Sequence, residues 1–169
     1  MRMPRLTLVG MAALACAMPL SAAAAAPSYM GAWTLTGAVK APWADPVHPI
    51  DPSEPSRLIG KAVVFKAGEI DGPRSIACQG ARYAVKDYTA DLLFQGAFGE
   101  MRLRDKRVDP AKIAASLGFT GPAIKTLETG CEIDFHFVNE ATAEIGLNDH
   151  VYTLKKRTLS LRGGGGAHH

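Results

Sequence analysis

Residues 143–154 read AEIGLNDHVYTL and predict a β-hairpin. The pair Asn148-Asp149 suits a two-residue turn between two strands. Pairing across that turn brings mostly apolar residues together on one face, in three opposed pairs: Leu147 with His150, Ile145 with Tyr152, and Ala143 with Leu154. A slip of one residue would turn all of these side chains to the other face, so the pattern sets the register of the hairpin.

Further strands are predicted before this hairpin, most clearly over residues 29–40, 100–108 and 131–138, where apolar and polar residues alternate. The others are predicted over residues 58–65, 75–85 and 89–97, the last with an apolar run that would be buried on both faces. One helix is predicted to begin at Asp109, which can cap it, and Pro110, which suits the first helical position, and to stop at Gly118. Residues 121–128 are ambiguous, with a short helical turn as one alternative.

Strands in this number and order predict a mainly β protein with one antiparallel sheet. A sheet exposes unpaired backbone groups at its two edges, and closure into a small barrel hides them. We therefore expect a single antiparallel barrel of about eight strands with one short helix, over residues 26–162. The glycine-rich residues 163–169 are predicted to form a disordered tail.

The first predicted strand has Trp33 and Val39 on one face, and its Gly31-Ala32-Trp33 resembles the GxW motif of lipocalins and other calycins. The resemblance implies a lipocalin-like barrel in which Trp33 closes one end and the loop after the first strand lies across the open end. It also implies that a basic residue near the last strand, Arg157 or Arg162, packs over the tryptophan. The lipocalin helix follows the eighth strand, whereas the helix predicted here precedes the last three strands.

Two other envelope families share short features with the chain. Gly68, Gly72 and Cys78 fall in an order similar to that of small META-type barrel domains. Gly80-Ala81-Arg82-Tyr83 resembles a motif of periplasmic inhibitors of c-type lysozyme, in which a loop enters the lysozyme cleft. A serine precedes the glycine in that family, whereas Gln79 stands at this position here.

The N-terminus has the three parts of a secretory signal peptide, namely Arg2 and Arg5, an apolar run over residues 6–20, and a stretch of alanines. The run is shorter than the roughly 20 apolar residues that a membrane span needs. Residues 1–25 are therefore predicted to be a signal peptide, and the mature chain is expected in the periplasm without a transmembrane span. An alternative is a lipid anchor at Cys16, because the residues before it faintly resemble a lipobox.

The charge of the chain bears on its partners, and its cysteine content bears on the compartment in which it works. Without Arg2 and Arg5, 17 basic residues face 16 acidic ones, which gives no electrostatic reason to expect nucleic acid or acidic lipid as a partner. Cys78 and Cys131 are the two cysteines outside the predicted signal peptide, and an oxidising compartment favours one disulfide between them. Two buried free thiols are the alternative.

No motif in the sequence indicates a reaction. The chain has no nucleophile elbow, phosphate-binding loop, dinucleotide fingerprint or Cys-x-x-Cys pair. Glu132, Asp134 and His136 lie on one face of a predicted strand and have the chemistry to bind zinc, but we interpret them as a solvated outer face. His150, beside the hairpin turn, is also expected to be exposed. We therefore expect no metal and no cofactor, and a protein that is not an enzyme.

The long loop over residues 41–57 is the best candidate for recognition. It contains five prolines, which stiffen it, and long loops of compact domains are often functional. Pro42, Trp43 and His48 lie in this loop, and Trp43 is either packed as a lid over the barrel mouth or offered to a partner. Together with Trp33, these residues form the candidate site.

These features predict an exported, non-enzymatic binding protein of the cell envelope. It would take either a small apolar ligand inside the barrel or an envelope protein at the barrel mouth. The alternative is a periplasmic inhibitor of a lysozyme or a protease. A roomy apolar interior would favour the carrier, whereas a filled interior would favour a role in interaction or inhibition.

Overall fold

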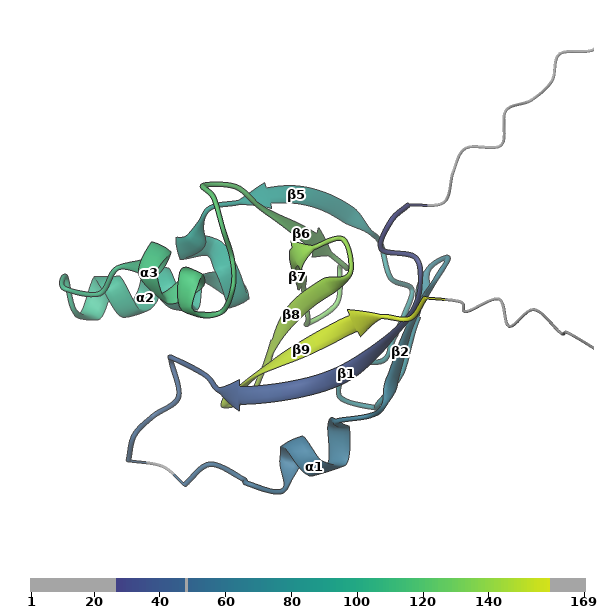
Figure 1. Ribbon diagram of the computed structural model, residues 1–169, viewed down its shortest axis with the longest axis horizontal. Coiled ribbons are helices and arrows are strands. Elements are labelled where there is room, and N and C mark those ends of the chain that lie inside the picture. Colours follow the sequence, from purple (N-terminus) through teal and green to yellow (C-terminus); the bar gives the residue numbers. More distant parts are fainter. Residues whose placement is uncertain (1–26, 48, 159–169) are drawn as a thin grey trace, which may run out of the picture.

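The structure is a computed structural model that describes residues 27–47 and 49–158. They form a nine-stranded antiparallel sheet that curls into a half-barrel, with few helices beside it (Figure 1). The strands are β1 (Gly31–Lys40), β2 (Ala62–Lys66), β3 (Glu69–Asp71), β4 (Cys78–Gln79), β5 (Ala84–Tyr88), β6 (Ile124–Glu128), β7 (Phe135–Asn139), β8 (Thr142–Leu147) and β9 (His150–Lys156). The helical segments are α1 (Glu54–Leu58), the 3-10 turn η1 (Ala90–Leu92), α2 (Leu93–Arg104) and α3 (Pro110–Ser116).

Several predictions concern residues outside these ranges. They are the signal peptide over residues 1–25 with the alternative anchor at Cys16, His48 in the proline-rich loop, Arg162, and the tail over residues 163–169. Among the helices of residues 27–47 and 49–158, none is long and apolar enough to cross a membrane.

The first and last strands pair with each other near the middle of the sheet. The strand order is β4-β3-β2-β1-β9-β8-β7-β6-β5. The sheet has nine strands because two of the predicted strands, over residues 89–97 and 100–108, are not formed, whereas β3 and β6 are additional and the predicted strand over residues 75–85 is divided into β4 and β5. Gly80 lies between these two with a φ of 75°, a conformation that favours glycine and interrupts an extended strand.

The hairpin of β8 and β9 has the predicted register. Leu147 lies opposite His150 and Ile145 opposite Tyr152, and Asn148 has the positive φ, 50°, that a tight two-residue turn requires. The side chain of His150 is nevertheless buried, with 8% of its surface exposed, so the expectation that it faces solvent was wrong.

The prediction of one continuous apolar face on β1 was correct only for its first half. Trp33 and Leu35 are fully buried, whereas Val39 is 53% exposed. The pairing of β1 with β9 shifts between Leu35 and Gly37. Such a bulge adds one residue to the strand and exchanges its two faces, so Val39 turns outward.

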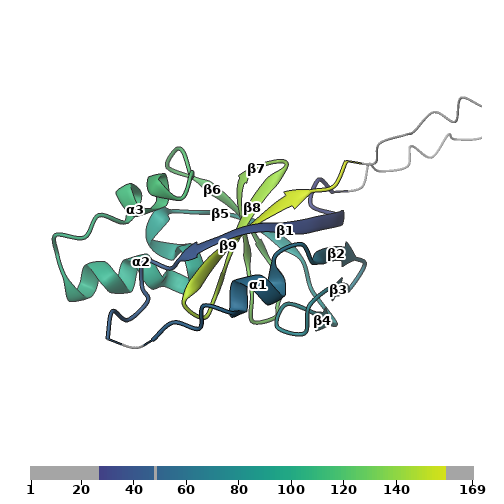
Figure 2. The ribbon, with the colours of Figure 1, turned by 60° about the horizontal axis from the view of Figure 1, so that its bottom comes forward.

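The concave face of the sheet is filled by large side chains. Phe65 of β2 and Phe135 of β7 have ring centroids 4.7 Å apart, although three strands lie between β2 and β7 in the sheet. Trp33 packs against both Phe65 and Phe137. The sheet must therefore curl far enough for its two halves to meet (Figure 2). These aromatic rings occupy the space between the halves.

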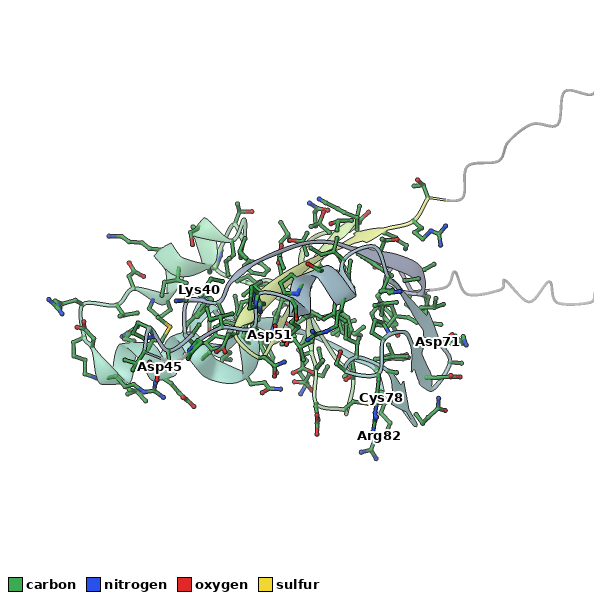
Figure 3. The ribbon with its side chains drawn as sticks, turned by 90° about the horizontal axis from the view of Figure 1, so that it is seen from below. Lys40, Asp45, Asp51, Asp71, Cys78 and Arg82 are labelled. Atoms are coloured by element: carbon green, nitrogen blue, oxygen red, sulfur yellow. A yellow bond between two sulfur atoms is a disulfide. The ribbon has the colours of Figure 1, made fainter. Side chains whose placement is uncertain are left out.

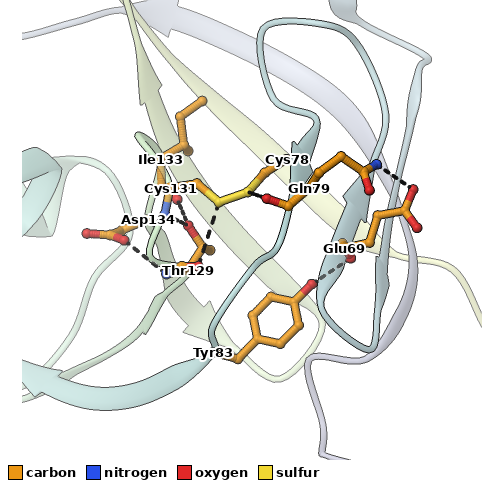
Figure 4. The surroundings of a disulfide bond; sticks show 8 residues. All are labelled: Glu69, Cys78, Gln79, Tyr83, Thr129, Cys131, Ile133 and Asp134. Atoms are coloured by element: carbon orange, nitrogen blue, oxygen red, sulfur yellow. Dashed lines mark hydrogen bonds between the residues drawn. A yellow bond between two sulfur atoms is a disulfide. The ribbon is translucent and has the colours of Figure 1, made fainter.

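The two ends of the curled sheet are tied together. Cys78 of the edge strand β4 forms a disulfide with Cys131, which follows β6 (Figure 4), as predicted. The backbone crosses the same gap, because Ala81 N donates to Gly68 O and Arg82 N donates to Thr129 O, both at 2.8 Å. We call residues 80–82 the strap. The strap and the disulfide therefore join strands that are not neighbours in the sheet.

The convex face carries a second apolar cluster, under α2 and α3. Its buried members come from both helices and from the strands below, namely Leu93, Phe94, Phe98, Ala114, Ile124 and Val151, with Ala41, Ala44 and Phe119 from loops. The sequence predicted strands over residues 89–97 and 100–108, where the structure has η1 and α2. The apolar run Leu92-Leu93-Phe94 fits a buried strand and a buried helix equally well, so its pattern did not distinguish them.

The helices α3 and α1 both begin with residues that favour a helix start, although only α3 was predicted. In α3, the only predicted helix, Asp109 Oδ1 accepts a hydrogen bond from Ala111 N at 3.0 Å and thereby caps the helix as expected. The sequence did not predict α1, in the proline-rich loop, although Pro55 occupies a position in the first turn that favours proline.

Because the disulfide links residues 53 positions apart, its removal should destabilise the fold. A double Cys78→Ser, Cys131→Ser variant should lose about 4 kcal/mol of unfolding free energy, because the longer unlinked chain gains conformational entropy when it unfolds. Urea denaturation followed by circular dichroism measures this loss. The intact mass of the wild-type protein should not change on alkylation without reductant, and it should increase by two alkyl groups when the protein is reduced first. A midpoint equal to that of the oxidised wild type would contradict the structural role.

Candidate functional site

An open pocket of about 300 Å³ lies on the convex side of the sheet, at the start of α2. Its walls come from four segments: the proline-rich loop, α2, the residues around the start of β7, and the turn between β8 and β9. The lining residues are Trp43, Phe94, Gln95, Ala97, Glu100, Ile133, Asp134, His136, Gly146 and Asn148. We call this the Trp43 pocket.

Trp43 is fixed in the pocket wall by a hydrogen bond and by two aromatic contacts. Its Nε1 donates to the backbone oxygen of Asn148 at 3.1 Å. Its ring centroid lies 5.1 Å from that of Phe94 and 6.1 Å from that of Phe98. The side chain remains partly exposed, so it is both packed on α2 and accessible from the pocket.

The other tryptophan lies elsewhere. Trp33 is fully buried in the concave cluster and donates from Nε1 to Tyr29 O at 2.9 Å. Lys156 Nζ lies 5.9 Å from the Trp33 ring centroid, so the cation over this ring comes from the residue before the expected Arg157. The structure therefore does not bring Trp33 and Trp43 into one site. Pro42 neighbours Trp43 in the chain but does not line the pocket.

Gly146 makes the close approach of the pocket aromatics possible. A Cβ atom at this position would lie 3.0 Å from Trp43 Cη2 and 3.1 Å from Phe94 Cδ1. Both distances are shorter than ordinary carbon contacts, so a side chain at this position would require one of the two rings to shift. Gly146 was not among the residues predicted for the site, although a glycine inside a strand pattern can signal a close approach of this kind.

The pocket wall also contains three consecutive residues with left-handed backbone. Phe94, Gln95 and Gly96 have φ values of 51°, 59° and 83°. For phenylalanine and glutamine this conformation costs on the order of 1–2 kcal/mol each. Contacts hold it in place, since Phe94 N donates to His136 Nε2 at 3.0 Å and the Gln95 side chain donates to Glu132 O.

His136 is a buried, neutral imidazole. Its Nε2 accepts from Phe94 N, so the ring proton is on Nδ1, which lies 2.9 Å from Thr126 Oγ1. Burial lowers the pKa of His136 to about 3. The interpretation of Glu132, Asp134 and His136 as a solvated face was therefore wrong for His136, because α2 covers this part of the sheet. In the part of the chain that the structure describes, no three His, Cys, Asp or Glu side chains gather as they would around a metal.

Carboxylates supply the charge of the pocket. Asp134 is half-buried, and its pKa is raised, chiefly by desolvation. Glu100 is more exposed and forms a 3.1 Å ion pair with Arg104, one turn further along α2. None of the ten lining residues is lysine or arginine. Because His136 is neutral, the described walls carry negative charge only.

Glu144 is a second buried carboxyl on the convex face. It lies opposite His136 in the pairing of β7 with β8 and accepts a hydrogen bond from Thr153 Oγ1 at 3.0 Å. Its side chain has little contact with solvent, and burial raises its pKa to about 7. At neutral pH a substantial part of the population therefore holds this carboxyl protonated.

The proline-rich loop is fastened to the β8–β9 turn on both sides of the pocket wall. Ala41 N donates to Asp149 O at 2.8 Å. At the other end of the loop, Glu54 accepts hydrogen bonds from Asn148 Nδ2 at 2.6 Å and from Tyr152 Oη at 2.7 Å. Figure 3 shows this loop, marked by Asp45 and Asp51, away from the end that carries Cys78 and Arg82. These hydrogen bonds fix the path of the proline-rich loop and thereby place Trp43 beside α2.

Comparison of the chain with protein-family models, with curated proteins and with solved structures gave no match. The function proposed below therefore rests on residue geometry.

Substitution at Gly146 should disturb the pocket without touching its polar groups. In Gly146→Ala the new methyl group would displace Trp43 or Phe94, and overpacking of this kind costs about 1–3 kcal/mol. Thermal unfolding and tryptophan fluorescence should both change. Gly37→Ala is the matched control, because a Cβ at Gly37 of β1 would meet nothing within 4 Å. Equal effects of the two substitutions would show that Gly146 is not specially required.

Glu144 should make the fold less stable as the pH rises from about 4.5 to 7. In that range the folded protein keeps a proton on Glu144 that the unfolded chain releases, so unfolding is favoured with rising pH. Glu144→Gln should remove this loss and raise the unfolding free energy at pH 8 by at most about 3 kcal/mol, with little change at pH 4. Denaturation across this pH range measures the difference, with the exposed Glu140→Gln as control. A difference that does not vary with pH would contradict the burial of the charge.

Proposed function

We propose that this protein is an exported, non-enzymatic binding module of the cell envelope that recognises a partner protein through the Trp43 pocket. The observation that carries the proposal is the contrast between the two faces of the sheet. Large side chains fill the concave face, whereas the convex face has an open pocket with a partly exposed tryptophan in its wall.

The filled interior supports recognition at the surface over a ligand held inside. Trp33, Phe135 and Tyr152 all lie on the concave face without solvent exposure. A carrier of small apolar ligands needs an interior cavity with apolar walls, and these rings occupy that space. Tryptophan in a partly exposed pocket is instead typical of residues that dominate protein interfaces.

We also propose a distant relationship to the calycin architecture. The buried Trp33 on the first strand and the cation of Lys156 near its ring support it. The nine strands, and the placement of α2 and α3 between β5 and β6, differ from the lipocalin arrangement. A periplasmic location is supported by the disulfide between Cys78 and Cys131, since such bonds persist in oxidising compartments.

Inhibition of a lysozyme or protease is the second candidate, and the exposed Arg82 favours it. This side chain points away from the body of the protein on the strap, beside the disulfide (Figure 3). The backbone of the strap is occupied by its hydrogen bonds to Gly68 and Thr129, so the strap is held against the sheet. An inhibitory contact would therefore rely on the Arg82 side chain, and loss of inhibition of c-type lysozyme in Arg82→Ala would identify it.

Site-specific photocrosslinking in the native periplasm tests the pocket as a docking site. A photoreactive amino acid at the exposed position of Gln95 should capture one partner, and the same amino acid at Val85 of the edge strand β5 should not. Adding Trp43→Ala should reduce the yield at position 95 at least tenfold, because a central aromatic anchor accounts for much of the energy of an interface.

Two results would contradict the proposal. Capture at position 85 but not at position 95 would place the binding surface elsewhere. An equal yield with and without Trp43→Ala, in a variant whose thermal unfolding shows it to be folded, would show that Trp43 does not take part in recognition.

A further inference from the structure

We infer that the Trp43 pocket receives a cationic side chain, an arginine or a lysine, presented by the partner protein. The pocket combines an aromatic wall, carboxylates and a size that suits a single side chain. The inference rests on the proposed function for the source of the cation, but the preference of the pocket for a cation follows from its own walls.

The aromatic wall provides one half of the recognition. Trp43 and Phe94 lie with centroids 5.1 Å apart and planes inclined by 40°, so they form an angled wall beside the opening. The face of an aromatic ring carries negative partial charge and attracts guanidinium and ammonium groups, and tryptophan does so most strongly. Because Asn148 O and the ring of Phe98 hold Trp43, its ring is already ordered before a ligand arrives.

The carboxylates provide the other half. Asp134 is half-buried, and its described polar contact is a long one, 3.4 Å from Thr129 N to Oδ1. Partial burial with such a weak contact makes the ionised form costly, which is seen in its raised pKa. A cation beside Asp134 would offset that cost. Glu100 can contribute from the rim, because its ion pair with Arg104 is exposed to solvent and therefore weak.

No group in the described walls repels a cation. The one basic side chain is that of His136, and its two ring nitrogens are occupied in the neutral form by Phe94 N and Thr126 Oγ1. The volume of about 300 Å³ is at the lower limit for small-molecule sites, so it suits a single side chain. An anionic or purely apolar group would meet Asp134 without compensation.

Butylguanidinium, a minimal mimic of the arginine side chain, is the probe. We expect it to shift the indole N–H resonance of Trp43 in two-dimensional proton–nitrogen NMR spectra, with binding in the millimolar range that weakens as salt is added. Butylurea has nearly the same shape without the charge, and it should bind at least tenfold more weakly. Equal binding of the two probes, or no shift at Trp43 with 100 mM butylguanidinium, would overturn the inference.

Paired substitutions locate the interaction. Asp134→Asn keeps the shape of the side chain and should weaken the binding of butylguanidinium at least fivefold. Asp71→Asn, on β3, removes the same charge from an exposed ion pair with Lys66 of β2 and should change the affinity less than twofold. Because Asp134 also contacts Thr129, Glu100→Gln serves as a second variant, with an expected loss of about twofold. An unchanged affinity in both pocket variants would overturn the inference.

The two proposals can fail separately. If a partner crosslinks at position 95 but butylguanidinium does not bind, the pocket is a docking site of another chemistry, and the cation inference is wrong. If butylguanidinium binds with the expected dependence on Asp134 but no partner crosslinks, the pocket prefers cations, and the assignment of the cation to a protein side chain is wrong. If both hold, 100 mM butylguanidinium should also reduce the crosslinking yield.

Discussion

The fold depends on the connection between the two ends of its curled sheet. The disulfide and the strap at residues 80–82 join β3 and β4 to the residues that follow β6, and they bring together strands that share no ladder. This connection holds the curl that packs Phe65 against Phe135. It also shields the large side chains of the concave face from water.

Because large side chains fill the concave side, the open Trp43 pocket lies on the convex side of the sheet. There α2 and α3 bury a second apolar cluster, but they cover the sheet incompletely, and the Trp43 pocket lies where α2 begins. The left-handed residues that shape this wall are costly by themselves. They persist because His136 and Gly146 favour the same arrangement, one by accepting a hydrogen bond from Phe94 N and the other by leaving space for the rings. Strain supported in this way is often found at binding sites.

Features encoded by neighbouring residues could be predicted from the sequence, whereas those that depend on distant segments could not. The hairpin turn at Asn148 and the helix cap at Asp109 each need only a few adjacent residues, and both were correct. In the candidate site, Trp43 was identified because a tryptophan is conspicuous in a proline-rich loop. The burial of His136 depends on α2, and the contact of Gly146 with Trp43 depends on a loop about a hundred residues away in the sequence. The pattern of apolar residues within a strand does not indicate which distant segment will cover that strand.

The pairing of β1 with β9 has a consequence for how the chain reaches its fold. Thr36 contacts Thr153 across this ladder, 117 positions further along the sequence, so the middle of the sheet joins the two extremes of the domain. Contacts of such high sequence separation slow folding, because a long loop must close before they form. The sheet cannot be completed until its last strand has been synthesised. A chain whose central strand pair forms last keeps its strand edges unpaired for longer, so the order of strands by itself prolongs the time in which an incomplete sheet can pair with other chains.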